Sequence, residues 1–211
     1  MVVTGNPGAG LSRFYLYFAF QLLRRHDGKV QELPPFELVL NSEDAFHKYC
    51  AKDDTFIELD KAEIRDLSKQ RSVLRLIEGN SSRLLGWKGV SILLANCGLK
   101  GLRSYANCNS FTYYVPMWSL CELQDYNSVF SDTLKLPDKI LVERFDKYGG
   151  NPRCIFTETQ PENDANFNRA IAVFDALKVV SYAECNTPVR DKDLSSCVLQ
   201  MVSSDSNFRA N

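Results

Sequence analysis

The chain has 211 residues, of which 45 % are apolar and 24 % charged, a composition typical of a globular protein with one large domain. Its 25 basic and 26 acidic residues nearly cancel, which argues against strong non-specific attraction to nucleic acid or to an anionic membrane. Seven cysteines without a CxxC pair, together with only two histidines, exclude the usual zinc-ligand spacings, so we expect reduced, buried thiols.

The N-terminal region predicts a short buried strand, a glycine-rich loop and a long helix. Residues 1–4 form the first apolar segment, and residues 12–25 carry aromatic and leucine side chains on nearly every side, which predicts a helix buried all round. Within that helix the apolar run 14–23 is shorter than the roughly 20 residues that span a bilayer. No small-residue cleavage site follows the run, so no signal peptide is visible.

The loop between this strand and helix fits the phosphate-loop pattern GxxxxGK[ST] at every fixed position except the lysine, where Leu11 stands. Its residues are Gly5, Asn6, Pro7, Gly8, Ala9, Gly10, Leu11 and Ser12. Glycines allow backbone N–H groups to turn inward around phosphates, and Ser12 would offer its hydroxyl to Mg²⁺. Arg13 is the next candidate for nucleotide contact, but it points roughly 200° away from position 11 and is not expected to replace the lysine. The alternative is a strand-to-helix turn without a ligand.

Four more apolar segments predict strands, and together with the first they predict a five-stranded parallel sheet sandwiched by helices. These segments are residues 36–40, 73–77, 90–95 and 111–115. Continuous apolar runs of about five residues suit strands that are buried on both faces. Helices are expected between them over residues 42–52 and 61–70, the second of which is charged and predicted to face solvent. This alternation indicates the α/β class.

Polar residues at the ends of two strands are candidate catalytic residues. Glu78 ends the third strand, where an acidic side chain would hold Mg²⁺ opposite the phosphate loop. Gly79 follows it, so no second carboxylate is present there to position an attacking water. Asn96 ends the fourth strand, which is expected between the first and third, and would sense the terminal phosphate. The alternatives are a solvated carboxylate at Glu78 and an ordinary turn residue at Asn96.

After about residue 126 the sequence predicts helices without strands. Helices are expected over residues 118–129, 136–145, 154–156 and 165–180, with Ser119 capping the first of them at Glu122. We therefore expect a P-loop core over residues 1–125, a helical lid-like subdomain over residues 126–190, and a partly disordered tail over residues 191–211.

Four stretches of the chain resemble P-loop ATPases of the STAND/AAA-like kind, and more closely the NTPase domain of Crinkler and retrotransposon hot spot (RHS) proteins. They are VTGNPGAGLSRF at 3–14, LIEG at 76–79, YYVPMWSLCEL at 113–123 and RFDKYGGNPR at 144–153. In that family the loop carries the lysine and the third strand usually ends in Asp, so Leu11 and Glu78 depart from the pattern. By this resemblance Gly150 and Pro152 would line the adenine pocket and Arg153 would reach a phosphate. The alternative is a helix-breaking turn.

The resemblance implies a module that binds ATP or ADP with Mg²⁺, taken from an effector that is secreted, acts in a host cell or its nucleus, and contacts host protein. A cytoplasmic location is the alternative. Family members commonly add an N-terminal header and a C-terminal effector domain, so we expect the NTPase module alone or a truncated copy.

The missing lysine decides between three functions. A charge-assisted hydrogen bond contributes about 1.5–3 kcal/mol, so its loss would weaken nucleotide binding roughly 10- to 100-fold. Hydrolysis would suffer more, since positive charge acts mainly in the transition state. A degenerate, weakly binding pseudo-ATPase is therefore the first hypothesis. An ATPase that takes its lysine from Lys100 or a neighbouring subunit, and a non-enzymatic interaction scaffold, are the alternatives.

Overall fold

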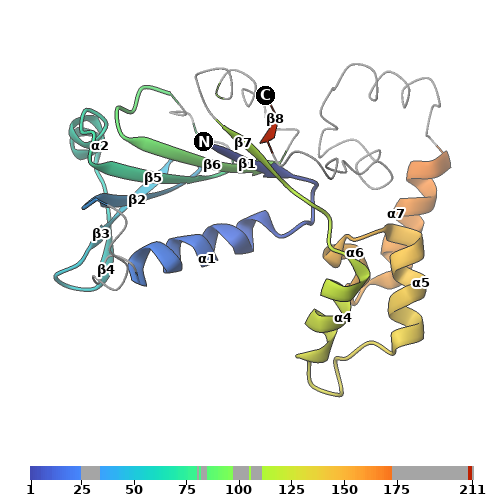
Figure 1. Ribbon diagram of the computed structural model, residues 1–211. Helices are drawn as coiled ribbons and strands as arrows, with labels where there is room; N and C mark the ends of the chain where they lie inside the picture. Colours follow the sequence, from blue (N-terminus) through green and yellow to red (C-terminus); the bar gives the residue numbers. More distant parts are fainter. Residues whose placement is uncertain are drawn as a thin grey trace.

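The computed structural model describes residues 1–24, 34–79, 81, 85–96, 105, 111–172 and 209–210. They form an α/β protein in which helices lie beside a mixed sheet (Figure 1). The strands are β1 (Val2–Gly5), β2 (Glu37–Ser42), β3 (Ala45–Cys50), β4 (Thr55–Glu58), β5 (Val73–Glu78), β6 (Val90–Asn96), β7 (Thr112–Val115) and β8 (Arg209–Ala210). The helices are α1 (Leu11–Arg24), α2 (Lys61–Leu67), α4 (Leu120–Ser128), α5 (Asp138–Tyr148), α6 (Pro152–Ile155) and α7 (Gln160–Ala172).

The strands follow the order β4-β3-β2-β5-β6-β1-β7-β8 across the sheet. The five segments expected to be strands are β1, β2, β5, β6 and β7, and they are parallel to one another. β6 lies between β1 and β5, as expected for the fourth strand. The prediction of a purely parallel, five-stranded sheet is wrong, because β3, β4 and β8 extend it and each pairs antiparallel with its neighbour.

The helix predicted over residues 42–52 is a β-hairpin. The pairing of β2 with β3 reaches Ser42 and Ala45 and leaves a two-residue turn, in which Glu43 has a positive φ of 52°. Buried Asn41 closes this turn, because its Nδ2 donates to the carbonyl oxygens of Glu43 at 2.9 Å and Ala45 at 3.0 Å. Side-chain bonds of this kind offer the backbone an alternative to a helix.

Helix α1 covers one face of the sheet (Figure 1). The core on this face consists of Val3, Leu11, Tyr15, Ala19, Leu22, Leu38, Leu76, Ile92 and Leu94. The expectation that the helix is buried all round is wrong, because the side of α1 turned away from the sheet exposes Leu16 by 64 % and Tyr17 by 58 %. In the described part of the chain, no helix has the length and apolar character that a membrane crossing requires.

Helix α2 covers part of the opposite face. The core on that side consists of Val39, Phe46, Leu59, Ile64, Leu67 and Val73. α2 is therefore not purely solvent-facing as predicted, since two of its side chains are buried there. Asp60 and Glu63 form a capping box at its start, in which the Asp60 carboxylate accepts from the Glu63 N–H at 2.8 Å and the Glu63 carboxylate accepts from the Asp60 N–H at 2.9 Å.

Helices α4 to α7, here called the helical group, have a core of their own. It consists of Leu123, Leu141 and Ile155. The cap predicted at the start of α4 is confirmed, because Ser119 Oγ accepts from the Glu122 N–H at 3.2 Å and the Glu122 carboxylate accepts from the Ser119 N–H at 2.7 Å. Reciprocal capping satisfies N–H groups that have no partner inside the helix.

The remaining C-terminal helices differ from the predictions mainly at their ends. α5 continues past the expected residue 145 to Tyr148, and α7 begins at Gln160, earlier than expected. Residues 173–180 of the last predicted helix, and all of the predicted tail except Arg209–Ala210, lie outside the described residues. Those two residues pair with β7.

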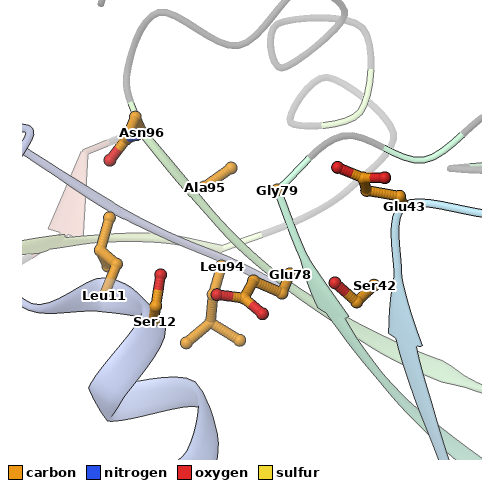
Figure 2. A pocket seen from close by; sticks show the side chains of 9 residues that line it. All are labelled: Leu11, Ser12, Ser42, Glu43, Glu78, Gly79, Leu94, Ala95 and Asn96. Carbon is orange, nitrogen blue, oxygen red and sulfur yellow. The ribbon is translucent and has the colours of Figure 1, made fainter.

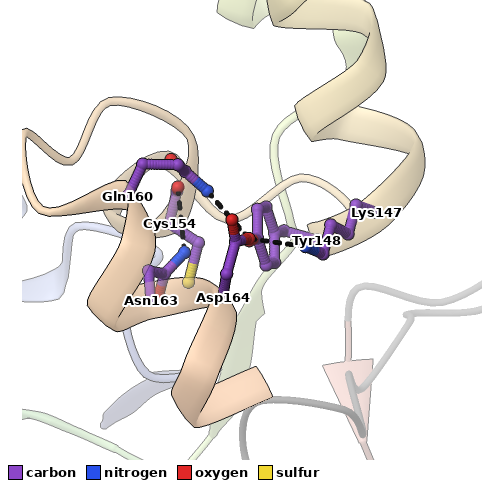
Figure 3. Close-up of polar contacts among 6 residues, drawn as sticks. All are labelled: Lys147, Tyr148, Cys154, Gln160, Asn163 and Asp164. Atoms are coloured by element: carbon purple, nitrogen blue, oxygen red, sulfur yellow. Dashed lines mark hydrogen bonds and ion pairs between the residues drawn. The ribbon is translucent and has the colours of Figure 1, made fainter. Parts of the chain in front are cut away.

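A polar network joins the end of α5 to α7 (Figure 3). The Asp164 carboxylate accepts hydrogen bonds from the Lys147 ammonium, the Tyr148 hydroxyl and, at 3.3 Å, the Gln160 amide. The bond from Lys147, followed by that from Tyr148, lowers the pKa of Asp164 from 3.8 to about 2. The charged form of this carboxylate therefore stabilises the helical group.

We expect Asp164→Asn to lower the free energy of unfolding at neutral pH by less than about 1 kcal/mol, because the ion pair with Lys147 is 38 % exposed. A carboxylate with a lowered folded-state pKa stabilises the protein above its unfolded pKa and loses that effect as the pH falls through the folded one. The difference between wild type and variant should thus shrink as the pH drops from about 4 towards 2. Urea unfolding between pH 7 and pH 2 measures it, with Asp66→Asn as a surface-charge control. A difference that is constant over this range contradicts the assignment.

Candidate functional site

A cavity of about 330 Å³ opens at the carboxyl ends of β2, β5 and β6, beside the N-terminus of α1 (Figure 2). Its lining consists of Leu11, Ser12, Ser42, Glu43, Glu78, Gly79, Leu94, Ala95 and Asn96. Three of these, Ser12, Glu78 and Asn96, come from separate segments that the sequence had singled out. Figure 2 shows the Ser12 hydroxyl and the Glu78 carboxylate pointing into the same space.

The parallel register explains why these residues meet. Gly5 at the end of β1 pairs with Asn96 at the end of β6, and Ser42 at the end of β2 pairs with Glu78 at the end of β5. Parallel strands present their carboxyl ends at one edge, and in open α/β sheets ligands bind at that edge.

The glycine-rich loop, residues 5–12, turns sharply between β1 and α1. Gly8 and Gly10 have positive φ angles of 89° and 98°, which residues with a Cβ rarely adopt. The Ala9 N–H donates to the Asn6 carbonyl at 3.1 Å, and the helical hydrogen bonds begin with the Phe14 N–H donating to the Gly10 carbonyl at 2.9 Å. The preceding N–H groups of the first turn of α1 are available to a ligand, and the helix dipole favours an anion there.

Leu11, in the place of the lysine, is 8 % exposed and belongs to the core under α1, while part of its side chain lines the cavity. None of the nine lining residues, all within the described part of the chain, is basic, and two of them are glutamates. Arg13, also a candidate for nucleotide contact, is exposed and is not among the lining residues. Lys100, named as a possible replacement, lies outside the described residues.

Glu43 is a cavity residue that the sequence reading missed. The sequence predicts a helix at this position, whereas the hairpin places Glu43 just beyond the end of β2, next to the end of β5. Figure 2 shows its carboxylate directed toward Gly79, beyond the strand ends, whereas the Glu78 carboxylate lies on the side of Ser12 and α1. Glu43 could have been identified from the sequence by its position directly after an apolar strand, which is the criterion that identified Glu78.

A buried arginine holds the turn that carries Glu43. Arg75 is fully buried, and its Nη2 donates to Asn41 Oδ1 and, at 3.3 Å, to Ser81 Oγ. Its guanidinium also lies 5.2 Å from the ring centre of Phe46 and 4.7 Å from that of Trp87. Because Asn41 is bonded at both ends of its amide, the Glu43 backbone is fixed in its unusual conformation.

Tyr15 lies one turn beyond Leu11 on α1 and is buried close to Glu78. Burial raises the pKa of its hydroxyl to about 12, the negative charge of Glu78 acts in the same direction, and a hydrogen bond with the Asn41 backbone opposes both. The hydroxyl therefore stays protonated at neutral pH and adds no charge beside the cavity.

The segment around Gly150 contacts the glycine-rich loop from the side of the helical group. Gly150, Pro152 and Arg153, which the resemblance nominated for the base and phosphates, are not among the cavity-lining residues, so those roles remain predictions. The contact is made instead by Asn151, whose Nδ2 donates to the Pro7 carbonyl at 3.2 Å. The sequence reading missed it because nothing in the local pattern pairs residues this far apart.

Chemically, the cavity offers hydroxyl, carboxylate and amide oxygens, the donor types that Mg²⁺ prefers. Ser12 and Glu78 are the predicted magnesium ligands and lie in it together. Among the described residues, no group of three or more His, Cys, Asp or Glu side chains is arranged to hold a metal by itself. A cation here would therefore need further ligands from a bound molecule or water.

Gly8→Ala should destabilise the protein more than Gly10→Ala does. Both positions have positive φ, which for a non-glycine residue costs roughly 1–3 kcal/mol. A Cβ at Gly8 would also lie 2.3 Å from Asn151 Oδ1, whereas one at Gly10 meets nothing within 4 Å. Chemical denaturation of both variants separates backbone strain from the contact. Equal losses would show that the approach of Asn151 to the loop contributes nothing.

A scan against protein-family models gives no match for this chain, and a search of curated proteins gives none either. The geometry of the cavity and of the glycine-rich loop is therefore the basis for inferring a function.

Proposed function

We propose that this chain is a nucleotide-binding module of the P-loop kind that binds ATP or ADP with Mg²⁺ weakly and hydrolyses it little or not at all. The observation that carries the proposal is the cavity, where the glycine-rich loop and the start of α1 meet the polar ends of β5 and β6. A strand, a loop with this spacing of glycines and a helix, in that order, are the parts of a phosphate-binding site.

The sheet supports the same proposal. Its five parallel strands put β1, which leads into the loop, next to β6 and one strand away from β5. In P-loop NTPases an acidic residue at a neighbouring strand end holds Mg²⁺ opposite the loop, and Glu78 has this position relative to Ser12. Asn96 would then face the terminal phosphate from the end of β6.

The negative charge of the cavity means that a nucleotide would bind there only together with a divalent cation. Phosphates approaching the cavity would meet the carboxylates of Glu43 and Glu78 without a basic side chain in the described lining to offset them. A divalent cation held by Ser12 and Glu78 and by the phosphates would remove this repulsion. The module should therefore bind nucleotide as its magnesium complex and not as the free anion.

The resemblance to Crinkler and RHS proteins extends the proposal to a biological setting. The helical group would be the lid-like subdomain, with Gly150, Pro152 and Arg153 beside the nucleotide. The protein of origin would be a secreted effector that contacts host protein in the host cell or its nucleus. A scaffold that acts only through protein interactions is the alternative for a module without hydrolysis.

Restoring the lysine tests the first proposal. We expect Leu11→Lys to tighten ATP–Mg²⁺ binding roughly 10- to 100-fold, because it returns a cation to the phosphate site. Leu16→Lys is the matched control, since Leu16 is 64 % exposed on α1 and lies outside the cavity lining. Titration calorimetry with ATP–Mg²⁺ and with ATP in EDTA measures both effects. The proposal fails if wild type does not bind and Leu11→Lys binds no better than the control.

One observation favours an active ATPase as the second candidate. Glu43 puts into the cavity the second carboxylate that is absent after Glu78, where it could orient an attacking water. If wild type releases phosphate from ATP, Glu43→Gln should reduce the rate about 100-fold or more while leaving the affinity for ADP–Mg²⁺ nearly unchanged. Ser12→Ala should weaken both. If the rate of phosphate release is unchanged in Glu43→Gln, Glu43 has no part in the reaction. If wild type releases no phosphate above background, the ATPase candidate fails and the proposed binding module is the function that is left.

A further inference from the structure

Two side chains of the helical group and its leading segment hydrogen-bond the backbone of the glycine-rich loop. Asn151 Nδ2 donates to the Pro7 carbonyl at 3.2 Å, and Trp118 Nε1 donates to the Ala9 carbonyl at 3.2 Å. Both acceptors lie inside the loop, two residues apart. The contacts join the N-terminal end of the chain to residues more than a hundred positions later.

The direction of these bonds fixes the neighbouring N–H groups. A trans peptide is planar, and its C=O and N–H point in opposite directions. The described chain has no cis peptide bond. Tying the Pro7 and Ala9 carbonyls to the helical group therefore turns the N–H groups of Gly8 and Gly10 away from it. These two N–H groups are the ones that a loop of this pattern would offer to a phosphate.

The two donors are themselves held in place. Asn151 also caps α6, since its Oδ1 accepts from the Arg153 N–H at 3.1 Å. The indole of Trp118 packs edge-on against Tyr126 with 5.5 Å between ring centres. Each side chain thus presents its donor to the loop in one orientation.

Two glycines allow the contact surfaces to come this close. A Cβ at Gly8 would lie 2.3 Å from Asn151 Oδ1, and one at Gly150 would lie 1.9 Å from the Trp118 carbonyl oxygen. The Trp118 N–H also donates to the Gly150 carbonyl at 3.0 Å, which links the two donor segments to each other. A side chain at Gly8 would push the helical group and the loop apart, and one at Gly150 would push apart the two segments that carry the donors.

We propose that Asn151 and Trp118 are positioning residues, which hold the loop in its anion-binding shape and make nucleotide affinity depend on docking of the helical group. This inference rests on the proposed nucleotide-binding function. Because linkage is reciprocal, nucleotide in the cavity stabilises the docked arrangement by the same free energy that docking adds to binding. The helical group therefore acts on the site without touching the cavity described above.

Two substitutions remove the donors with little change of shape. Trp118→Phe keeps an aromatic ring against Tyr126 but has no N–H for Ala9. Asn151→Asp keeps the oxygen that caps α6 but sets a second oxygen against the Pro7 carbonyl. Each should weaken ADP–Mg²⁺ binding about two- to tenfold, the factor expected for one lost hydrogen bond. The double variant should lose less than the product of the single effects, since both act on one loop.

Matched controls exist for both substitutions. Asn127→Asp makes the same change inside the helical group, where Asn127 Nδ2 donates to the Leu136 carbonyl at 2.8 Å. Tyr148→Phe removes the donor of an aromatic side chain inside the helical group, where the Tyr148 hydroxyl donates to Asp164. These variants should lower the melting temperature but leave ADP–Mg²⁺ affinity and loop exchange at wild-type values.

Hydrogen exchange without nucleotide separates this inference from the proposed function. Amides of residues 5–14 should exchange several-fold faster in Trp118→Phe and Asn151→Asp than in wild type or the controls. If wild type does not bind ADP–Mg²⁺, the proposed function fails, while faster loop exchange still supports positioning. The inference is overturned if loop exchange is unchanged in both variants. It is also overturned if wild type binds and both variants match its affinity, because the contacts then serve stability alone.

Discussion

Parallel pairing of β2, β5, β6 and β1 is the constraint on which the site depends. It aligns four carboxyl ends at one sheet edge, so that Ser42 stands opposite Glu78 and Gly5 opposite Asn96. The position of β1 also determines where α1 begins. The chain leaves β1 at Gly5 and turns back over the sheet before α1 starts at Leu11. A polar cavity at that edge is thus a consequence of strand direction, and every residue that lines it is at a strand end, just beyond one or at the helix start, except Leu94 and Ala95 within β6.

Charge balance decides what such a cavity can hold. The N-terminus of α1 contributes the equivalent of roughly half a positive charge, which attracts phosphate only within the first turn. Against it stand two carboxylates, and Leu11 contributes apolar surface where a lysine would contribute charge. A lysine at position 11 would supply a cation to the cavity, whereas with Leu11 there a bound anion would need to bring its own cation. Leu11 is also part of the core under α1.

The sequence was informative where local pattern and burial agree. Five continuous apolar runs identified the parallel strands, and the Ser119–Glu122 cap was readable because its partners are three residues apart. The hairpin of β2 and β3 was missed because residues 42–52 were predicted to be a helix, and Glu43 in its turn was missed for the same reason. β4 was missed because it is exposed along its whole length. Asn151 could not be identified at all, because its contact with Pro7 spans 144 positions and depends on how the helical group docks.

The hydrogen bonds that shape the glycine-rich loop come from its own backbone and from two distant side chains, whereas the side chain at position 11 packs in the core under α1. The turn of the loop depends on two positive φ angles and on an internal hydrogen bond from Ala9 to Asn6. Its outer carbonyls are bonded to Trp118 and Asn151, which belong to a part of the chain with a separate core. A basic residue at position 11 would therefore add charge to the site without replacing any of these hydrogen bonds. The shape of the loop is therefore set by folding contacts, which do not depend on any reaction at the cavity.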